Sequence, residues 1–307
     1  MSTTLVMGGF TPSVLLAVAR RRGRLEEEDL QVTEVPVTSS PAQFRSLLDG
    51  EIDGAFTSPD NVVAYRFGKD NPLGVMADVT IVSTVDRGLG LGLYLRPGLE
   101  DPERLRGATL AVDVATSGFA LAMYALGESV GVGRDEYQLV ALGSTPKRLR
   151  ALLGGECDAT MLNAGNELYA EQAGCRLVAR VVDVCSPYIG TVLSVAGNEH
   201  LEPVRRLAAA LRRTAQDICS GEIDDEVIAT EATSVLELPR ELAGRYVARL
   251  KDPGQGLIIE EHIDRVGLAT VVNLRRRFHP YVVNGVDLLA DAVSPGSGLV
   301  ADDEAER

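Results

Sequence analysis

The sequence has no tryptophan, three histidines and four cysteines among its 307 residues. The cysteines form no Cys-x-x-Cys pair and the histidines do not cluster with them, which disfavours a zinc site or a redox dithiol. We therefore expect the cysteines to be reduced and packed as small apolar side chains, and we expect neither a metal nor a cofactor. The four are Cys157, Cys175, Cys185 and Cys219.

Long apolar runs are also missing. No segment reaches the roughly 18 consecutive apolar residues that cross a bilayer, so we expect no direct membrane insertion. Residues 1–7 read MSTTLVM and lack a basic segment followed by an apolar segment and a small-residue cleavage site. The chain as written is therefore expected to be cytoplasmic, or periplasmic if its N-terminus is truncated.

Basic residues are the minority among the charged ones. Thirty Lys and Arg against 44 Asp and Glu give a formal net charge of −14. An acidic surface repels nucleic-acid phosphates and anionic lipids, so we exclude both as partners. Apolar residues make up 45% of the chain, enough for a large core. At roughly 150 residues per domain, the length predicts two lobes.

An internal repeat organises the chain. Residues 44–61, FRSLLDGEIDGAFTSPDN, match residues 149–166, LRALLGGECDATMLNAGN, at seven of 18 positions and an offset of 105 residues. The same offset aligns the apolar run after Thr4 with the run after Thr109. A true duplication and convergence on common α/β patterns both remain open.

Each repeat unit alternates short apolar runs with Ser/Thr-rich turns and amphipathic segments, which predicts strands followed by helices. Glycines near residues 50 and 155 are suited to end two of these helices. Such alternation predicts parallel sheets with helices on both faces. The predicted strands cover residues 5–7, 54–57, 109–114 and 159–162, and the predicted helices cover residues 14–22, 119–130 and 145–153.

The fold class predicted is α/β, with two lobes that are each a mainly parallel sheet flanked by helices. Residues 79–96 and 188–196 are expected to form strands that cross between the lobes. Lobe 1 would comprise residues 1–86 and 191–294, and lobe 2 residues 87–190. Helices expected within residues 199–221, 239–250 and 258–278 would cover lobe 1. The Gly-rich and then acidic segment 295–307 is expected to be disordered.

Polar turns follow four of the predicted strands, two in each lobe. In open parallel sheets, ligands bind beyond the carboxyl ends of the strands, where the N–H groups of helix N-termini attract anions. If the lobes face each other, the four turns meet in one cleft. The alternative for any one residue is helix capping without ligand contact. The ligand-binding candidates are Phe10, Thr11, Ser13, Ser58, Asp60, Asn61, Thr116, Ser117, Gly118 and Asn163.

The run LLDGEIDGA at residues 47–55 resembles the L-x-x-G-x-x-D segment of type 2 periplasmic solute-binding proteins of ABC transporters. Gly-Phe-Thr-Pro at residues 9–12 and Ala-Thr-Ser-Gly at residues 115–118 resemble the nitrate/sulfonate/taurine branch, which includes NMT1/THI5-like proteins. The resemblance implies two lobes that close by a hinge, helix N-termini that hold an anionic group, and Phe10 against the body of the ligand. It also implies an ABC transporter permease as a partner.

Two functions follow from this reading. The first is a solute-binding protein that closes on a small anionic or polar organic molecule, such as a sulfonate, a carboxylate or a pyrimidine-like compound, for uptake or sensing. The alternative is a cytoplasmic enzyme on the same scaffold, a decarboxylase, desulfinase or isomerase of a small organic acid. The related aromatic sulfinate desulfinase has a nucleophilic cysteine near the position of Phe10, where this chain has none. Catalysis would then depend on Asp60 as a general base, on Tyr188 or on one of the four cysteines.

Three other patterns are interpreted as structural. Residues 88–92, GLGLG, lack the G-x-G-x-x-G spacing of a phosphate loop and are predicted to form a crossing strand. The arginine triplets at residues 20–22 and 275–277 are predicted to be solvated helix ends. The three histidines fall outside the four polar turns and are not expected to be catalytic. They are His200, His262 and His279.

Overall fold

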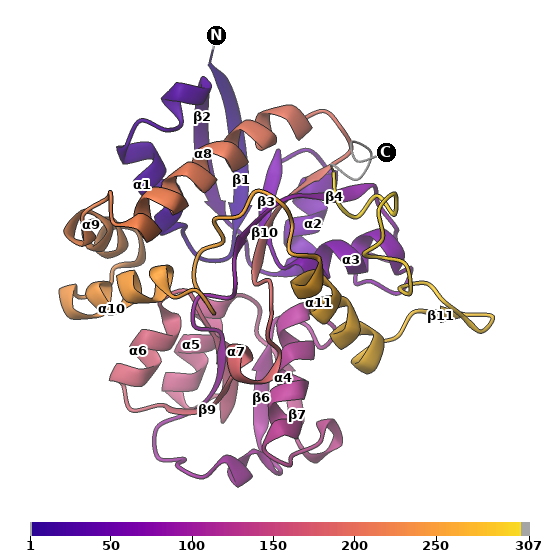
Figure 1. Ribbon diagram of the computed structural model, residues 1–307. Coiled ribbons are helices and arrows are strands. Elements are labelled where there is room, and N and C mark those ends of the chain that lie inside the picture. Colours follow the sequence, from indigo (N-terminus) through magenta and orange to yellow (C-terminus); the bar gives the residue numbers. More distant parts are fainter. Residues whose placement is uncertain (1, 302–307) are drawn as a thin grey trace.

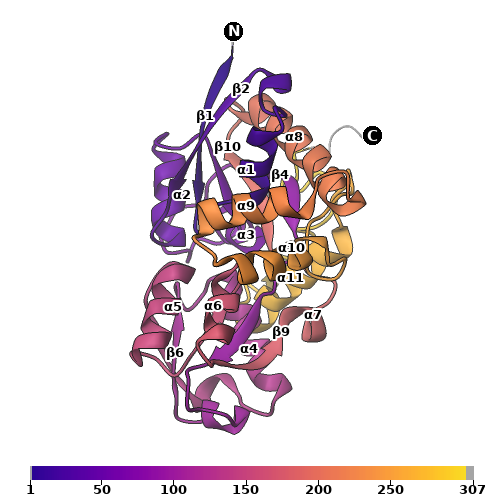
Figure 2. The ribbon, with the colours of Figure 1, turned by 90° about the vertical axis from the view of Figure 1, so that its left-hand side faces the viewer.

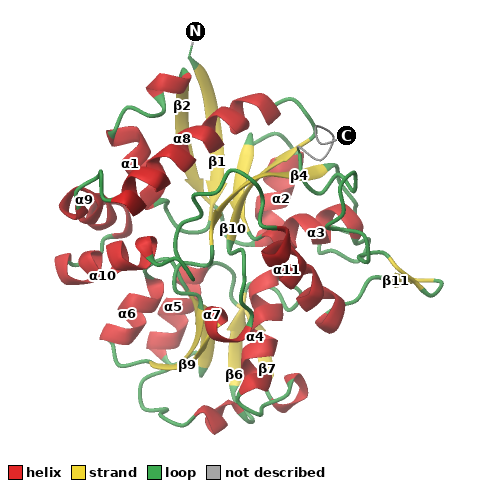
Figure 3. Ribbon diagram, in the orientation of Figure 1, coloured by secondary structure: helices red, strands yellow, loops and turns green. Residues whose placement is uncertain are grey.

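The computed structural model describes residues 2–301. Two five-stranded sheets lie one beyond the other, with helices on both faces of each (Figure 1; Figure 3). The chain leaves the first sheet after strand β4 (Val79–Asp86), builds the second, and returns to the first as β10 (Thr191–Ala196). The α/β class and the two-lobed arrangement predicted from the sequence are confirmed.

The sheet of the first lobe has the order β2-β1-β3-β10-β4. Its first three strands run parallel, and β10 runs antiparallel to both of its neighbours. Helices α1 and α8 pack on one face and α2 and α3 on the other. The remaining elements of this lobe in the N-terminal part of the chain are β1 (Thr3–Gly9), α1 (Val14–Arg21), the 3-10 helix η1 (Glu26–Glu28), β2 (Leu30–Pro36), α2 (Ser40–Leu48), β3 (Gly54–Thr57) and α3 (Pro59–Phe67).

The sheet of the second lobe has the order β7-β6-β8-β5-β9, so each strand occupies the place of its counterpart in the first lobe. Here too one strand, β5, runs antiparallel to both neighbours. The elements are β5 (Gly92–Leu95), η2 (Pro102–Leu105), β6 (Thr109–Val112), α4 (Gly118–Ser129), η3 (Arg134–Glu136), β7 (Gln138–Ala141), α5 (Thr145–Gly154), β8 (Ala159–Leu162), α6 (Asn166–Gln172), β9 (Arg176–Arg180) and α7 (Val181–Val184).

The aspartates matched by the repeat perform the same structural task in both lobes. Asp53 accepts a hydrogen bond from the backbone N–H of Val6 at 2.7 Å, and Asp158 accepts one from Thr109 at 2.9 Å. Each aspartate therefore ties the turn before one strand to the neighbouring parallel strand. The matched Gly50 adopts a φ of +73°, which favours glycine at a helix end. The L-x-x-G-x-x-D pattern thus encodes a turn and not a ligand contact.

Four helices follow β10 and cover the first lobe and the junction of the lobes (Figure 2). Helix α9 was not predicted from the sequence, because its apolar residues follow helical spacing over only a short stretch of the chain. Helix α11 begins seven residues later than predicted, and it packs against α3 of the first lobe and α4 of the second. The elements are α8 (Leu201–Ser220), α9 (Asp225–Leu236), α10 (Arg240–Lys251) and α11 (Arg265–Phe278), followed by the hairpin β11 (Val282–Val283) and β12 (Val286–Asp287).

The expected disorder from residue 295 onward is wrong for residues 295–301. Leu299 and Val300 are buried, and Leu299 accepts a backbone hydrogen bond from Ile81 at 2.8 Å. The apolar side chains of this segment complete the core beside β4, which composition alone did not indicate. The rest of the predicted tail, residues 302–307, lies outside the described residues.

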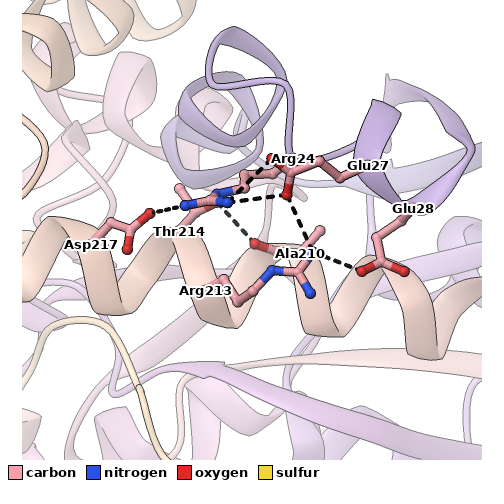
Figure 4. A network of polar contacts seen from close by, with 7 residues as sticks. All are labelled: Arg24, Glu27, Glu28, Ala210, Arg213, Thr214 and Asp217. Carbon is pink, nitrogen blue, oxygen red and sulfur yellow. Dashed lines mark hydrogen bonds and ion pairs between the residues drawn. The ribbon is translucent and has the colours of Figure 1, made fainter.

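Ion pairs fasten α8 to the 3-10 helix η1 of the first lobe (Figure 4). Arg24 contacts Asp217 at 2.7 Å and Glu27 at 3.0 Å. Arg213 contacts Glu28 at 2.7 Å. The contacts of Arg24 with Asp217 and of Arg213 with Glu28 join segments that are almost 200 residues apart in the sequence, beside the apolar stripe of α8 that packs in the core.

Candidate ligand-binding site

A cavity of about 120 Å³ lies at the junction of the two lobes. It is bounded by the carboxyl ends of β1, β3 and β4 in the first lobe and of β6 and β8 in the second, with α10 as a further wall. Parallel strands bring their carboxyl ends to one edge of a sheet, which explains why segments far apart in sequence meet here. For scale, an engineered cavity of about 150 Å³ binds benzene.

Eight of the ten predicted ligand-binding residues line this cavity. They come from both lobes, as the repeat required, and their contact with a ligand remains a prediction. The eight are Phe10, Thr11, Ser13, Ser58, Asn61, Ser117, Gly118 and Asn163.

Most of the polar residues in this group are also held by their own lobe. The hydroxyl of Ser13 accepts a hydrogen bond from the N–H of Leu16, and that of Ser58 accepts one from Asp60. The amide of Asn163 donates to the carbonyl of Gly88 at 3.2 Å. Ser117 differs, because its hydroxyl is buried without a hydrogen-bond partner and its residue is only 6% exposed. Its unpaired hydroxyl makes Ser117 the predicted candidate best placed to bond a ligand.

The structure places Asp60 outside the cavity lining. Both of its carboxylate oxygens accept hydrogen bonds from Arg275, at 2.7 and 2.6 Å. Both side chains are 1% exposed, so the expectation that residues 275–277 form a solvated helix end is wrong at Arg275. The guanidinium occupies one lone pair on each oxygen, and the buried ion pair keeps the carboxylate turned toward Arg275 and outside the cavity lining. The geometry therefore argues against Asp60 as a general base or a ligand contact.

Thr116 and Tyr188 also lie outside the lining. Thr116 accepts a hydrogen bond from Arg275 at its backbone carbonyl, at 2.6 Å. Tyr188 is 2% exposed, and burial raises the pKa of its hydroxyl well above the usual value. A phenol that is so hard to ionise is a poor general base.

The four cysteines are free thiols and none of them lines the cavity. Burial raises the pKa of three of these thiols to about 11 and raises that of the fourth as well. A thiol with a raised pKa is a weak nucleophile near neutral pH. Within residues 2–301, no group of three or more His, Cys, Asp or Glu side chains is placed to hold a metal ion. No helix in the same range is long and apolar enough to cross a membrane.

Two of the helix N-termini near the cavity, those of α1 and α2, are already paired with carboxylates of the protein. At the start of α1, the N–H of Ser13 lies 3.0 and 3.2 Å from the two carboxylate oxygens of Glu34. At the start of α2, the N–H of Ser40 donates to Asp113 at 2.9 Å. Two N–H groups of the kind expected to hold a ligand anion are therefore occupied by the chain itself.

Among the lining residues that the sequence did not indicate are all three charged ones and the tyrosine: Asp86, Asp113, Arg148 and Tyr246. Asp86 ends β4, and Asp113 directly follows β6. The rule that ligands bind at strand ends points to Asp113, but the Ser/Thr turn that follows it has the more conspicuous sequence pattern. Tyr246 lies on α10, and nothing local in the sequence indicates that this helix reaches the cavity.

Burial sets the charge behaviour of these residues. Asp86 is 3% exposed, and desolvation raises the pKa of its carboxyl to about 6, although hydrogen bonds from Thr191 and Gly88 oppose the shift. Burial lowers the pKa of Arg148 to about 10, and the negative charge of Asp113 opposes that shift. Arg148 therefore remains protonated near neutral pH. Asp86 is mostly ionised there, but its pKa lies only about one unit below neutral pH.

The two lobes are in direct contact around the cavity. Asp113 of the second lobe accepts the hydrogen bond from Ser40 of the first, and Ser144 donates its N–H to the carbonyl of Thr38 at 3.1 Å. A methyl group placed on Gly118 would lie 2.6 Å from the Cβ of Asp60. The absence of a side chain at Gly118 is therefore required for the first turns of α3 and α4 to meet.

No protein-family model matches the sequence, and no curated protein matches it either. Solved structures do match. The periplasmic nitrate-binding protein NrtA from Synechocystis PCC 6803 superposes with a TM-score of 0.74 at 13% identity, over 99% of this chain and 88% of that one. The alkanesulfonate-binding protein SsuA from Xanthomonas axonopodis pv. citri, bound to MOPS, gives a TM-score of 0.69 at 17% identity, over 91% of this chain and 94% of that one.

A Candida albicans protein, described as defining a new family with the generic periplasmic-binding-protein fold, gives a TM-score of 0.69 at 16% identity. That match covers 97% of this chain and 96% of the other. The three similarities together cover nearly the whole chain at low identity. The chain therefore has the periplasmic-binding-protein fold, as its sequence repeat and its L-x-x-G-x-x-D segment suggested.

Proposed function

We propose that this protein is a solute-binding protein that closes its two lobes around one small organic molecule. The observation that carries the proposal is the cavity at the carboxyl ends of both sheets, with lining residues from each lobe. A ligand in that position touches both lobes at once, so its binding energy favours the closed arrangement. In the closed arrangement, Asp113 of the second lobe would accept a hydrogen bond from Ser40 of the first, and Gly118 would lie against Asp60.

The resemblance supports a role in which the protein delivers its ligand to an ABC transporter permease. If no transporter is involved, the protein would instead act as a ligand sensor. A protein for import would work outside the cytoplasmic membrane, and a sensor would work inside it. The NMT1/THI5-like and alkanesulfonate-binding branches are the relatives from which such a role would be inherited. Sulfonate, carboxylate and pyrimidine-like ligands are the classes that follow from this resemblance.

An enzyme on the same scaffold is the second candidate. It is weakened by the state of the groups that could perform catalysis, since Asp60 is paired, Tyr188 is buried and the cysteines do not reach the cavity. Asp86 is the one group of the lining whose pKa, at about 6, suits proton transfer near neutral pH. The enzyme alternative therefore depends on Asp86.

Incubation of the purified protein with a metabolite extract, followed by mass spectrometry of retained and consumed compounds, separates these functions. The proposal predicts one compound retained unchanged in a one-to-one complex. A compound consumed with the appearance of a matching product would instead establish an enzyme. If nothing is retained or consumed from extracts of several growth conditions, the proposed function is wrong.

A further inference from the structure

The charged side chains of the cavity lining are two carboxylates and one guanidinium: Asp86, Asp113 and Arg148. The carboxylates come from opposite lobes, since Asp86 ends β4 and Asp113 follows β6. With all three ionised, the lining carries one net negative charge. In a partly dry cavity such a charge acts strongly, because little water is present to screen it.

The positive charge of Arg148 is engaged by the protein. Its guanidinium donates to the hydroxyls of Thr160 and Thr145, both at 3.1 Å, and to the carbonyls of Gly143 and Met161. Four of its five N–H groups are thereby used, and the residue is 3% exposed. An incoming anion would find one N–H group at most, where anion-binding arginines present a two-pronged face.

Acceptor atoms, in contrast, are left open in the lining. One carboxylate oxygen of Asp113 is bonded to Ser40, and the other is buried with no hydrogen-bond partner. The hydroxyl of Ser117, from the same lobe, is buried and unpaired as well. A buried polar atom without a partner costs free energy, which a ligand that supplies N–H donors would recover.

Further carboxylates surround the cavity just behind its wall. The pKa of the Tyr246 hydroxyl is raised well above its usual value, mainly by burial and then by the negative charges of Glu167, Asp86 and Glu34. Glu167 is partly balanced by Arg249, whose Nε lies 3.8 Å from it. Burial raises the pKa of Glu167 to about 7 and also raises that of Glu34, so Asp86 is the carboxylate that contributes most of the negative charge at this side of the cavity near neutral pH.

The apolar part of the lining fits an organic body. Phe10, Phe56, Phe119 and Tyr246 all face the cavity, along with aliphatic residues of β4 and α10. Aromatic faces attract cations as well as apolar groups. The lining thus combines aromatic walls with carboxylates at two places on opposite lobes.

We propose that the ligand is a small organic cation, with a protonated amine or related nitrogen group recognised by Asp86 and Asp113 and an apolar body held by the aromatic residues. The inference rests on the proposed function of solute binding and adds the charge of the solute. A cation that contacts carboxylates of both lobes would also link binding to closure, because it gains both attractions only when the lobes are together.

The test uses the full-length protein and a metabolite extract separated by ion exchange into cationic, neutral and anionic fractions. Each fraction is dialysed to equilibrium against the protein near neutral pH, and the retained compounds are measured by mass spectrometry. Asp86→Asn and Asp113→Asn keep side-chain shape and an oxygen for the bonds from Gly88 and Ser40. Glu100→Gln removes one charge at an exposed position outside the lining and serves as the matched control.

The expected result is retention from the cationic fraction, weakened at least about tenfold in Asp86→Asn and Asp113→Asn and unchanged in Glu100→Gln. Circular dichroism and thermal melts show whether the variants are folded. If a variant is not folded, the inference is judged only by which fraction the wild-type protein retains a compound from. Retention from the anionic or the neutral fraction would overturn the inference while leaving the proposed function intact. Retention from no fraction would overturn both.

Discussion

Arg275 of α11 binds both carboxylate oxygens of Asp60 in α3, although 215 residues separate them in the sequence. The same guanidinium donates to the carbonyl of Thr116 in the second lobe and to the hydroxyl of Tyr281. Arg275 therefore joins segments of both lobes beside the cavity. These contacts hold α3, α11 and the start of α4 together, and the charge of Arg275 is compensated by Asp60.

Removing one partner of this pair should be costly. Arg275→Met leaves the buried Asp60 carboxylate unpaired, and the expected loss is about 3–5 kcal/mol of the free energy of unfolding. Urea denaturation measures it. The neighbouring Arg276→Met, whose side chain is 44% exposed, is the control and should cost less than about 1 kcal/mol. Equal losses in the two variants would contradict the assigned role of Arg275.

Gly118→Ala should hinder closure without unfolding either lobe. The added methyl group would lie 2.6 Å from the Cβ of Asp60 and 2.7 Å from the hydroxyl oxygen of Ser58, both in the other lobe. The variant is expected to bind the retained compound more weakly and to have a larger radius of gyration than the wild type. Gly244→Ala, where no atom lies within 4 Å of the added carbon, should leave both quantities unchanged.

The hydroxyl of Ser117 should contribute to binding and that of Thr116 should not. Ser117 is unpaired and lines the cavity, whereas Thr116 bonds only through its carbonyl to Arg275. Ser117→Ala is expected to reduce the affinity for the retained compound by about 1–2 kcal/mol, and Thr116→Ala by less than about 0.5 kcal/mol. Calorimetric titration of both variants measures these losses of affinity. A larger loss in Thr116→Ala than in Ser117→Ala would show that the ligand does not bind beside Ser117.

Asp86 should make the stability of the unliganded protein depend on pH. Its pKa is raised from 3.8 to about 6 in the folded state, so folding binds a proton more tightly. The stabilisation is fully present below about pH 4 and is lost as the pH rises through 6. Relative to Asp86→Asn, the wild type should lose up to about 3 kcal/mol between about pH 4 and 8.

Urea denaturation of both proteins across this range measures the difference. Acids whose pKa is lowered, such as Asp158 and Asp264, act in the opposite direction but are common to both proteins. A constant difference between wild type and variant would show that Asp86 is not desolvated as described.

Much of the fold was predictable because it is encoded locally. The repeat, the capping Ser13 and the helix-ending Gly50 act within a few residues of themselves, and strands 54–57 and 159–162 were predicted with their observed bounds. The predicted mainly parallel sheets also contain one strand, β10 or β5, that runs antiparallel to its neighbours. The direction of this strand depends on how the chain crosses between the lobes, and no local sequence pattern indicates that path.

The position of the cavity was predictable from the sequence, but the charge of its lining was not. Strand ends and polar turns located eight lining residues, since that rule follows from the geometry of parallel sheets. The pairing of Asp60 with Arg275, and of Asp113 with Ser40, depends on contacts between residues far apart in sequence. Because these contacts cannot be recognised in the sequence, the sequence alone predicts free helix N-termini and therefore an anionic ligand.

Small-angle X-ray scattering, with and without the compound that the protein retains, tests most directly whether the lobes close on a solute in this cavity. A saturating concentration is expected to lower the radius of gyration of the wild type and to have a smaller effect on Gly118→Ala. An unchanged radius of gyration in the wild type, with binding demonstrated in the same sample, would contradict closure of the lobes on the solute.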